Sequence, residues 1–88
     1  MRFLHAEQYL GPNDSMQFRL SHRARVMLLD STNFSAYQNR RRFTYYGGWA
    51  QRSPLRLAPP YAGHWHAIVD LDGRSGTITA SMQILRRA

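Results

Sequence analysis

The stretch Gly63-His-Trp-His-Ala-Ile-Val-Asp-Leu71 decides the fold class of this 88-residue chain. Every second position in it is apolar. One set is Trp65, Ala67, Val69 and Leu71, and the set between is His64, His66, Ile68 and Asp70. An alternation with period two is typical of a β-strand whose two faces meet different surroundings. The first set therefore predicts a core face, and the second predicts a face that carries both histidines.

The same period recurs on both sides of this stretch. Towards the C-terminus, a turn at Asp72-Gly73 predicts a hairpin into a last strand whose inward side chains are Ile78, Ala80, Met82 and Ile84. Towards the N-terminus, Arg25–Leu29 is continuously apolar after its first residue, which indicates a central strand covered on both faces. Further strands are predicted at residues 3–9, 16–20, 43–46 and 55–57.

These patterns predict one domain over residues 1–88. We expect a mainly β fold, either a β-sandwich or a jelly-roll-like, partly open barrel, of six to seven short antiparallel strands. Asp30 and Ser31 can cap a short helix at about residues 32–39, in which Phe34 and Tyr37 share the face that packs on the sheet. Gly47-Gly48 is predicted to be a turn or a bulge.

The composition favours an anionic partner. The formal net charge is +7, and all twelve basic residues are arginine. A base-composition preference for arginine codons accounts for the absence of lysine, but not for the positive charge. The chain has no cysteine, and no apolar run approaches the ~20 residues of a membrane span. We therefore expect a cytoplasmic protein, with homodimerisation as a remedy for its small core.

Several motifs resemble those of the domain of unknown function 1883 family of small bacterial proteins. They are Tyr45-Tyr-Gly-Gly-Trp49, Arg52-Ser-Pro-Leu-Arg-Leu57, the stretch from Gly63 to Leu71, Asn33-Phe34 with Tyr37, and Phe3-Leu4-His5. The resemblance implies a compact, mainly β fold and no established activity. Some relatives are fused to signalling domains of the Toll/interleukin-receptor type, so the resemblance also implies a sensing or binding module.

A basic and aromatic surface is the main functional prediction. Its residues are Arg40, Arg41, Arg42, Tyr46, Trp49 and Arg52. Arginine beside exposed rings suits a nucleic acid strand or another anionic ligand, because charge follows the backbone and rings stack on bases. The alternative is that the arginines form a solvated face and the rings fill the core. We expect a non-enzymatic binding module without a cofactor or catalytic residues.

The alternative from another class is a small metal-dependent or hydrolytic enzyme centred on His64 and His66. Both imidazoles would lie on one strand face, but Asp70 lies about 13 Å from His66 along an extended strand. A third ligand would have to be His5 or His22, and in hydrolysis Arg52 or Arg56 would hold a phosphate. No serine lies in a nucleophile motif. A third interpretation is a structural subunit that assembles only with itself.

Overall fold

A computed structural model of the chain describes residues 3–71 and 78–86. Within these ranges the chain forms seven strands and one helix. They are β1 (Phe3–Leu10), β2 (Ser15–Leu20), β3 (Ala24–Leu29), α1 (Ser31–Gln38), β4 (Tyr46–Ala50), β5 (Leu55–Leu57), β6 (Gly63–Asp70) and β7 (Ala80–Leu85).

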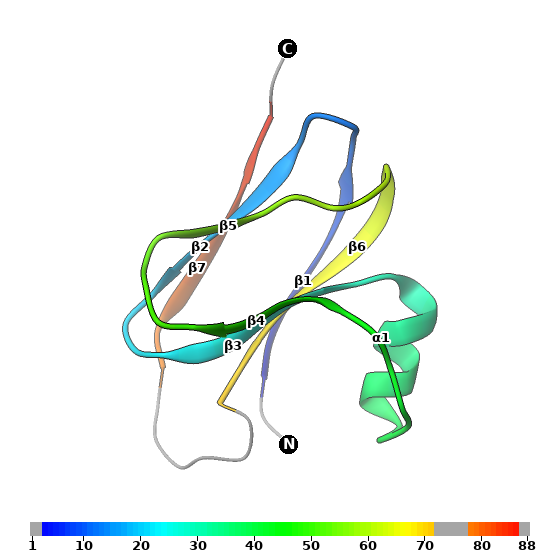
Figure 1. Ribbon diagram of the computed structural model, residues 1–88, viewed down its shortest axis with the longest axis horizontal. Helices are drawn as coiled ribbons and strands as arrows, with labels where there is room; N and C mark the ends of the chain where they lie inside the picture. Colours follow the sequence, from blue (N-terminus) through cyan, green and yellow to red (C-terminus); the bar gives the residue numbers. More distant parts are fainter. Residues whose placement is uncertain (1–2, 72–77, 87–88) are drawn as a thin grey trace.

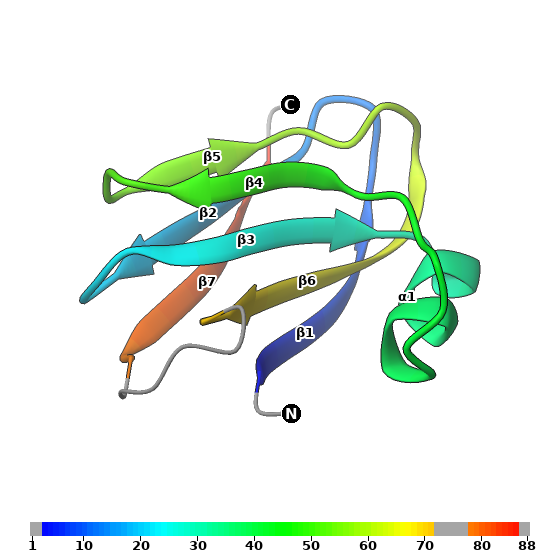
Figure 2. The ribbon, with the colours of Figure 1, turned by 60° about the horizontal axis from the view of Figure 1, so that its bottom comes forward.

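The strands form two sheets, and their strands are labelled in Figure 1. The larger sheet has the order β1-β6-β3-β4, and the smaller has the order β5-β2-β7. Every recorded pairing is antiparallel. Figure 2 shows α1 beside one end of the larger sheet, away from the β2–β3 and β4–β5 turns. The mainly β prediction is confirmed, and the described strands do not close into a barrel.

The inner face of the larger sheet packs against the smaller sheet and holds the main core. Trp65, Ala67 and Val69 of β6 are at most 1% exposed, and they pack with Val26 and Leu28 of β3. The partly buried hydrophobic side chains of β7 include Ala80, Met82 and Ile84. The alternation read from the two strands is therefore confirmed, because the predicted apolar sets point into one core.

Helix α1 covers one part of the outer face of the larger sheet. Met27 and Leu29 of β3, with Ile68 of β6, pack here against Tyr37 of the helix. Phe34 and two other aromatic rings complete this second, smaller cluster. Strand β3 thus lies between β6 and β4 with apolar cover on both faces, as its continuous apolar sequence predicts.

Helix α1 begins one residue earlier than the sequence predicts and ends one residue earlier, at Gln38. The side chain of Asp30 caps it by accepting the N–H of Asn33 at 2.8 Å. That backbone hydrogen bond lowers the pKa of Asp30 below its usual value. Asn39 is the C-cap, so the arginine run lies beyond the helix and no basic residue occupies its last turn.

The glycine pair is where the predicted secondary structure is wrong. Gly47 and Gly48 lie inside β4, which starts at Tyr46 rather than at Phe43, and they form no turn. Gly47 has φ 131°, and a Cβ there would overlap the carbonyl oxygen of Val26. A glycine at this position lets β4 approach β3 closely in a backbone conformation that other residues rarely adopt.

The predicted hairpin between the last two strands is also wrong. Strand β6 pairs with β1 and β3, whereas β7 pairs with β2 in the other sheet. The Asp72-Gly73 turn itself lies outside the described residues. The chain therefore passes from one sheet to the other between Asp70 and Ala80.

Candidate functional site

The aromatic residues of the predicted basic surface lie on opposite faces of β4. Tyr46 is paired with Leu28 and packs edge-on against Trp65, with ring centroids 5.8 Å apart, at the margin of the inner face. Trp49 is paired with Arg25 on the outer face. Because the two residues are three positions apart in a strand, they cannot form one stacking platform.

The arginines of the predicted surface are also divided. Arg40, Arg41 and Arg42 are exposed in the segment that leads from α1 to β4. Arg52 follows β4, in the turn to β5, and Figure 1 places that turn at the end of the molecule away from α1. The structure therefore does not bring Arg52 together with the arginine run.

Arg52 instead lines a pocket of about 240 Å³ between two turns. The β2–β3 turn contributes Ser21, His22 and Arg23, and the β4–β5 turn contributes Gln51 and Ser53. Two hydrogen bonds hold the walls, since the N–H of Leu20 donates to Ser53 Oγ at 2.8 Å and that of Thr79 donates to Ser21 Oγ at 2.9 Å. We call this the turn pocket; its remaining lining residues are Leu20 and Ala50.

The turn pocket is positively charged. Arg23 and Arg52 line it together with His22, and none of the described residues that line it carries a carboxylate. In the described part of the chain, neither Arg23 nor Arg52 has a recorded ion-pair partner, whereas Arg86 contacts Asp14 at 2.7 Å. Guanidinium groups without a carboxylate partner can bind a phosphate or carboxylate through paired N–H donors.

Sequence reasoning identified Arg52, considered His22 only as a third metal ligand, and missed Arg23. His22 and Arg23 lie in Ser21-His-Arg23, between β2 and β3, which carries two basic side chains. That signal was available, but nothing local places this turn beside the one that holds Arg52. The hydrogen bond between Leu20 and Ser53, which are 33 residues apart, brings the two turns together.

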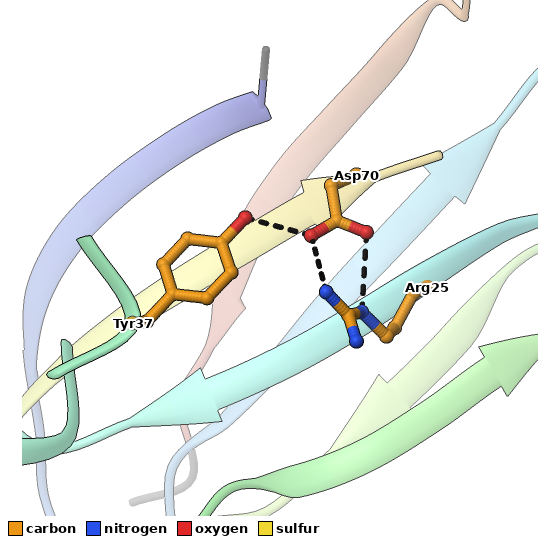
Figure 3. A network of polar contacts seen from close by, with 3 residues as sticks. All are labelled: Arg25, Tyr37 and Asp70. Carbon is orange, nitrogen blue, oxygen red and sulfur yellow. Dashed lines mark hydrogen bonds and ion pairs between the residues drawn. The ribbon is translucent and has the colours of Figure 1, made fainter. Parts of the chain in front are cut away.

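On the outer face, Asp70 is the centre of a buried polar network (Figure 3). Its carboxylate accepts from Arg25 Nε at 3.1 Å and from Arg25 Nη2 at 2.9 Å. The Tyr37 hydroxyl donates to it at 2.7 Å. Burial, followed by the hydrogen bond to Asp70, raises the pKa of Tyr37. Asp70 therefore joins β6, β3 and α1, and it is not a third ligand for the histidines.

The two histidines of the predicted enzyme site have different surroundings. His64 is exposed and meets the ring of Tyr9 edge-on, with centroids 5.8 Å apart. His66 is only 6% exposed, and burial lowers its pKa below the usual 6.5. No group of three potential metal ligands occurs among residues 3–71 and 78–86, so the described chain offers no metal centre at this pair.

His66 has partners that the sequence did not predict. Its Nδ1 lies 2.8 Å from His5 Nε2, and its Nε2 lies 3.2 Å from Ser31 Oγ. The carboxylate of Glu7 is 3.6 Å from the same Nε2. The ring of Phe34 stacks on both imidazoles, with centroids 4.4 Å from His5 and 4.2 Å from His66. His5 was predicted only as a third metal ligand, and Ser31 only as a helix cap.

The fold defines a class: a small, mainly β protein of two antiparallel sheets with one helix on an outer face. Over its whole length, residues 1–88, the chain matches the family described as Domain of unknown function (DUF1883), and it belongs to that family. The resemblance read from the sequence motifs is thereby confirmed.

Comparison with curated proteins and with solved structures found no match. Among the described helical residues, no segment is long and apolar enough to cross a membrane.

Proposed function

We propose that this protein is a binding module that holds a small anionic group, such as a phosphate, in the turn pocket. The observation that carries the proposal is the meeting of Arg23, Arg52 and His22 around one hollow that no carboxylate of residues 3–71 and 78–86 lines. The hydroxyls of Ser21 and Ser53 line the same hollow. Such a set combines fixed positive charge with short donors, as phosphate recognition requires.

The volume of the turn pocket favours a small anionic group over a large ligand. Pockets for drug-sized ligands have volumes of about 300–1,000 Å³, and the turn pocket has about 240 Å³. A second hollow of about 260 Å³ shares Leu20 and Ser21 with it and is also lined by Arg19. A phosphate in the first hollow could therefore carry a substituent that extends towards Arg19.

The acidic residues of the described chain have partners outside the turn pocket, which supports the proposal of an anion site there. Asp14 accepts from Arg86, Asp70 accepts from Arg25, and Asp30 caps α1. Glu7 lies beside His66 on the outer face. The guanidinium groups of Arg23 and Arg52 therefore have no described carboxylate that competes with a ligand, and both contribute to the net charge of +7.

Isothermal titration with inorganic phosphate and pyrophosphate at low ionic strength tests the proposal. Arg52→Ala should weaken binding about ten- to a hundredfold, which corresponds to about 1.5–3 kcal/mol for a charge-assisted hydrogen bond. Arg42→Ala is the matched control, because it removes the same charge from an exposed position outside the pocket.

The control separates a site from general electrostatic attraction. Equal loss in the two variants would show that the net charge attracts anions without a site, and the proposal would be wrong. Absence of binding by the unsubstituted protein at millimolar ligand would also overturn it. Binding of a single-stranded oligonucleotide that depends on Arg42 but not on Arg52 would favour the nucleic acid interpretation instead.

A further inference from the structure

The contacts around His66 resemble the hydrogen-bond chain of a nucleophilic serine. Ser31 Oγ lies 3.2 Å from His66 Nε2, and His5 Nε2 lies 2.8 Å from His66 Nδ1. In serine hydrolases the base contacts the serine through Nε2 and its orienting partner through Nδ1, and this order of atoms recurs on unrelated folds. Three separate elements, α1, β6 and β1, bring the three side chains together.

The protons of the two imidazoles fit this arrangement. A hydrogen bond between two ring nitrogens requires one donor and one acceptor. When His66 Nδ1–H donates to His5 Nε2, the Nε2 of neutral His66 is an acceptor that faces the Ser31 hydroxyl. The pKa of His66 is lowered by burial, so this neutral form persists to lower pH than for an exposed histidine.

The surroundings hold the base in place while leaving the serine accessible. His66 is 6% exposed, and the Phe34 ring stacks on it within 8° of parallel. His5 lies within 8° of the plane of His66, so the two rings are aligned. Ser31 is exposed as the first residue of α1. An external molecule can therefore reach Oγ without entering the core.

We propose that Ser31 is a nucleophile, with His66 as its general base and His5 as the positioning residue, and that this site hydrolyses accessible carboxylic esters. Ser31 Oγ adds to the carbonyl carbon while its proton passes to His66 Nε2. The carbonyl re-forms as the bond to the alcohol oxygen breaks, and His66 returns the proton to that oxygen. Water then attacks the acyl-serine with His66 again as base, and the carboxylic acid and Ser31 are released.

Charges near the site set the expected rate. Glu7 Oε2, 3.6 Å from His66 Nε2, stabilises the imidazolium that forms when the serine loses its proton. The N-terminus of α1 favours negative charge on the tetrahedral oxygen, but the Asp30 carboxylate that caps it opposes that charge. We therefore expect slow turnover.

Labelling with a fluorophosphonate probe, read by intact mass and peptide mapping, is the direct test. The unsubstituted protein should take up one label at Ser31, and Ser31→Ala should take up none. His66→Gln should slow the labelling at least about a hundredfold, as expected for the loss of a general base. A labelling rate for His66→Gln equal to that of the unsubstituted protein would overturn the proposal.

Ser21 provides an internal control. Its Oγ lies 2.9 Å from Nδ1 of the adjacent, exposed His22, so it has a histidine contact without a second imidazole behind it. Label on Ser21 and Ser31 in equal amounts would show ordinary surface reactivity and refute a site. Arg86→Ala, at a residue outside both proposed sites, should label like the unsubstituted protein.

The role of His5 requires a measurement that folding alone would not change. The labelling rate of the unsubstituted protein should fall with acidification through a pKa below 6.5, because His66 must be neutral. In His5→Gln that pKa should move and the maximal rate should fall, with an unchanged circular dichroism spectrum. Histidine titrates between about pH 5 and 8. A labelling rate of the unsubstituted protein that is constant across this window would exclude a histidine base, even if a variant failed to fold.

Discussion

The two faces of the β1-β6-β3-β4 sheet make different kinds of contact. The inner face is hydrocarbon and indole, packed against the second sheet. The outer face combines a small apolar cluster with a buried ion pair, a tyrosine hydroxyl and two hydrogen-bonded imidazoles. An apolar core tolerates the replacement of one hydrophobic side chain by another of similar volume. A buried polar network is stable only when each donor and acceptor has its partner. The outer face is therefore where chemistry is concentrated and where single substitutions act on specific bonds.

The largest effect should come from Asp70→Ala on the outer face. The substitution leaves the Arg25 guanidinium and the Tyr37 hydroxyl without the carboxylate that accepts from both. Removing one partner of a buried pair costs about 3–5 kcal/mol of unfolding free energy. Urea unfolding followed by circular dichroism measures it.

Arg86→Ala is the matched control for that experiment. It removes the Arg86–Asp14 ion pair, in which the arginine side chain is 58% exposed and the Asp14 side chain is 9% exposed. Because Asp14 keeps the N–H of Gly11 as a donor, the expected loss is about 1 kcal/mol. A loss for Asp70→Ala no greater than that of the control would show that the outer network contributes no more than surface charge does.

Consecutive residues of β3 allow the faces to be compared directly. Leu28 points to the inner face and Met27 to the outer face, and both are fully buried. Truncation of either to alanine should cost about 2–5 kcal/mol. We expect Leu28→Ala to be the more costly, because the larger core on its side is held between two sheets and collapses less readily than a helix-covered cluster. Equal urea unfolding midpoints for Leu28→Ala and Met27→Ala would contradict this prediction.

A smaller effect is expected from Tyr37→Phe, which removes only the hydroxyl that donates to Asp70 at 2.7 Å. Loss of a hydrogen bond to a charged group costs about 1.5–3 kcal/mol. The folded-state pKa of Tyr37 is raised above its usual 10, so its contribution is complete below pH 10 and is lost as the pH rises further. The stability of Tyr37→Phe should fall less steeply above pH 10.

The smallest effect should be the acid dependence contributed by His66. Its folded-state pKa is lowered by burial, so the contribution is present above pH 6.5 and is lost as the pH falls through the folded pKa. His66→Gln should flatten the stability profile in that window, measured by thermal unfolding between about pH 4 and 7. An unchanged slope would mean that other groups account for the acid sensitivity.

The inner face could be predicted from sequence to a large extent, because its information is local. The alternation around Trp65 identified the buried set of β6, and the short oxygens of Asp30 predicted the start of α1. Periodicity and capping depend on neighbouring residues, which the sequence shows directly. The glycine pair in β4 misled the prediction, because glycine serves both turns and closely approaching strands.

The polar partnerships could not be predicted, because they join distant parts of the chain. His5 and His66 are 61 residues apart, and Arg25 and Asp70 are 45 apart. Their contact follows from the placement of β6 between β1 and β3, an order that no local pattern encodes. Trp49 and Tyr46 were grouped by closeness in sequence, and the pleat of β4 separated them. The turn pocket likewise depends on two turns that meet only in the fold.

The pairing of β1 with β6 has a consequence for synthesis on the ribosome. Among the described strands, the first, Phe3–Leu10, pairs only with Gly63–Asp70. Until that late segment has left the exit tunnel, β1 has no described strand to pair with. His66, which lies in the same segment, has not yet been synthesised either. Vectorial folding from the N-terminus is thus excluded for the larger sheet. Late, non-local pairing of this kind makes folding slow relative to helical proteins of the same size.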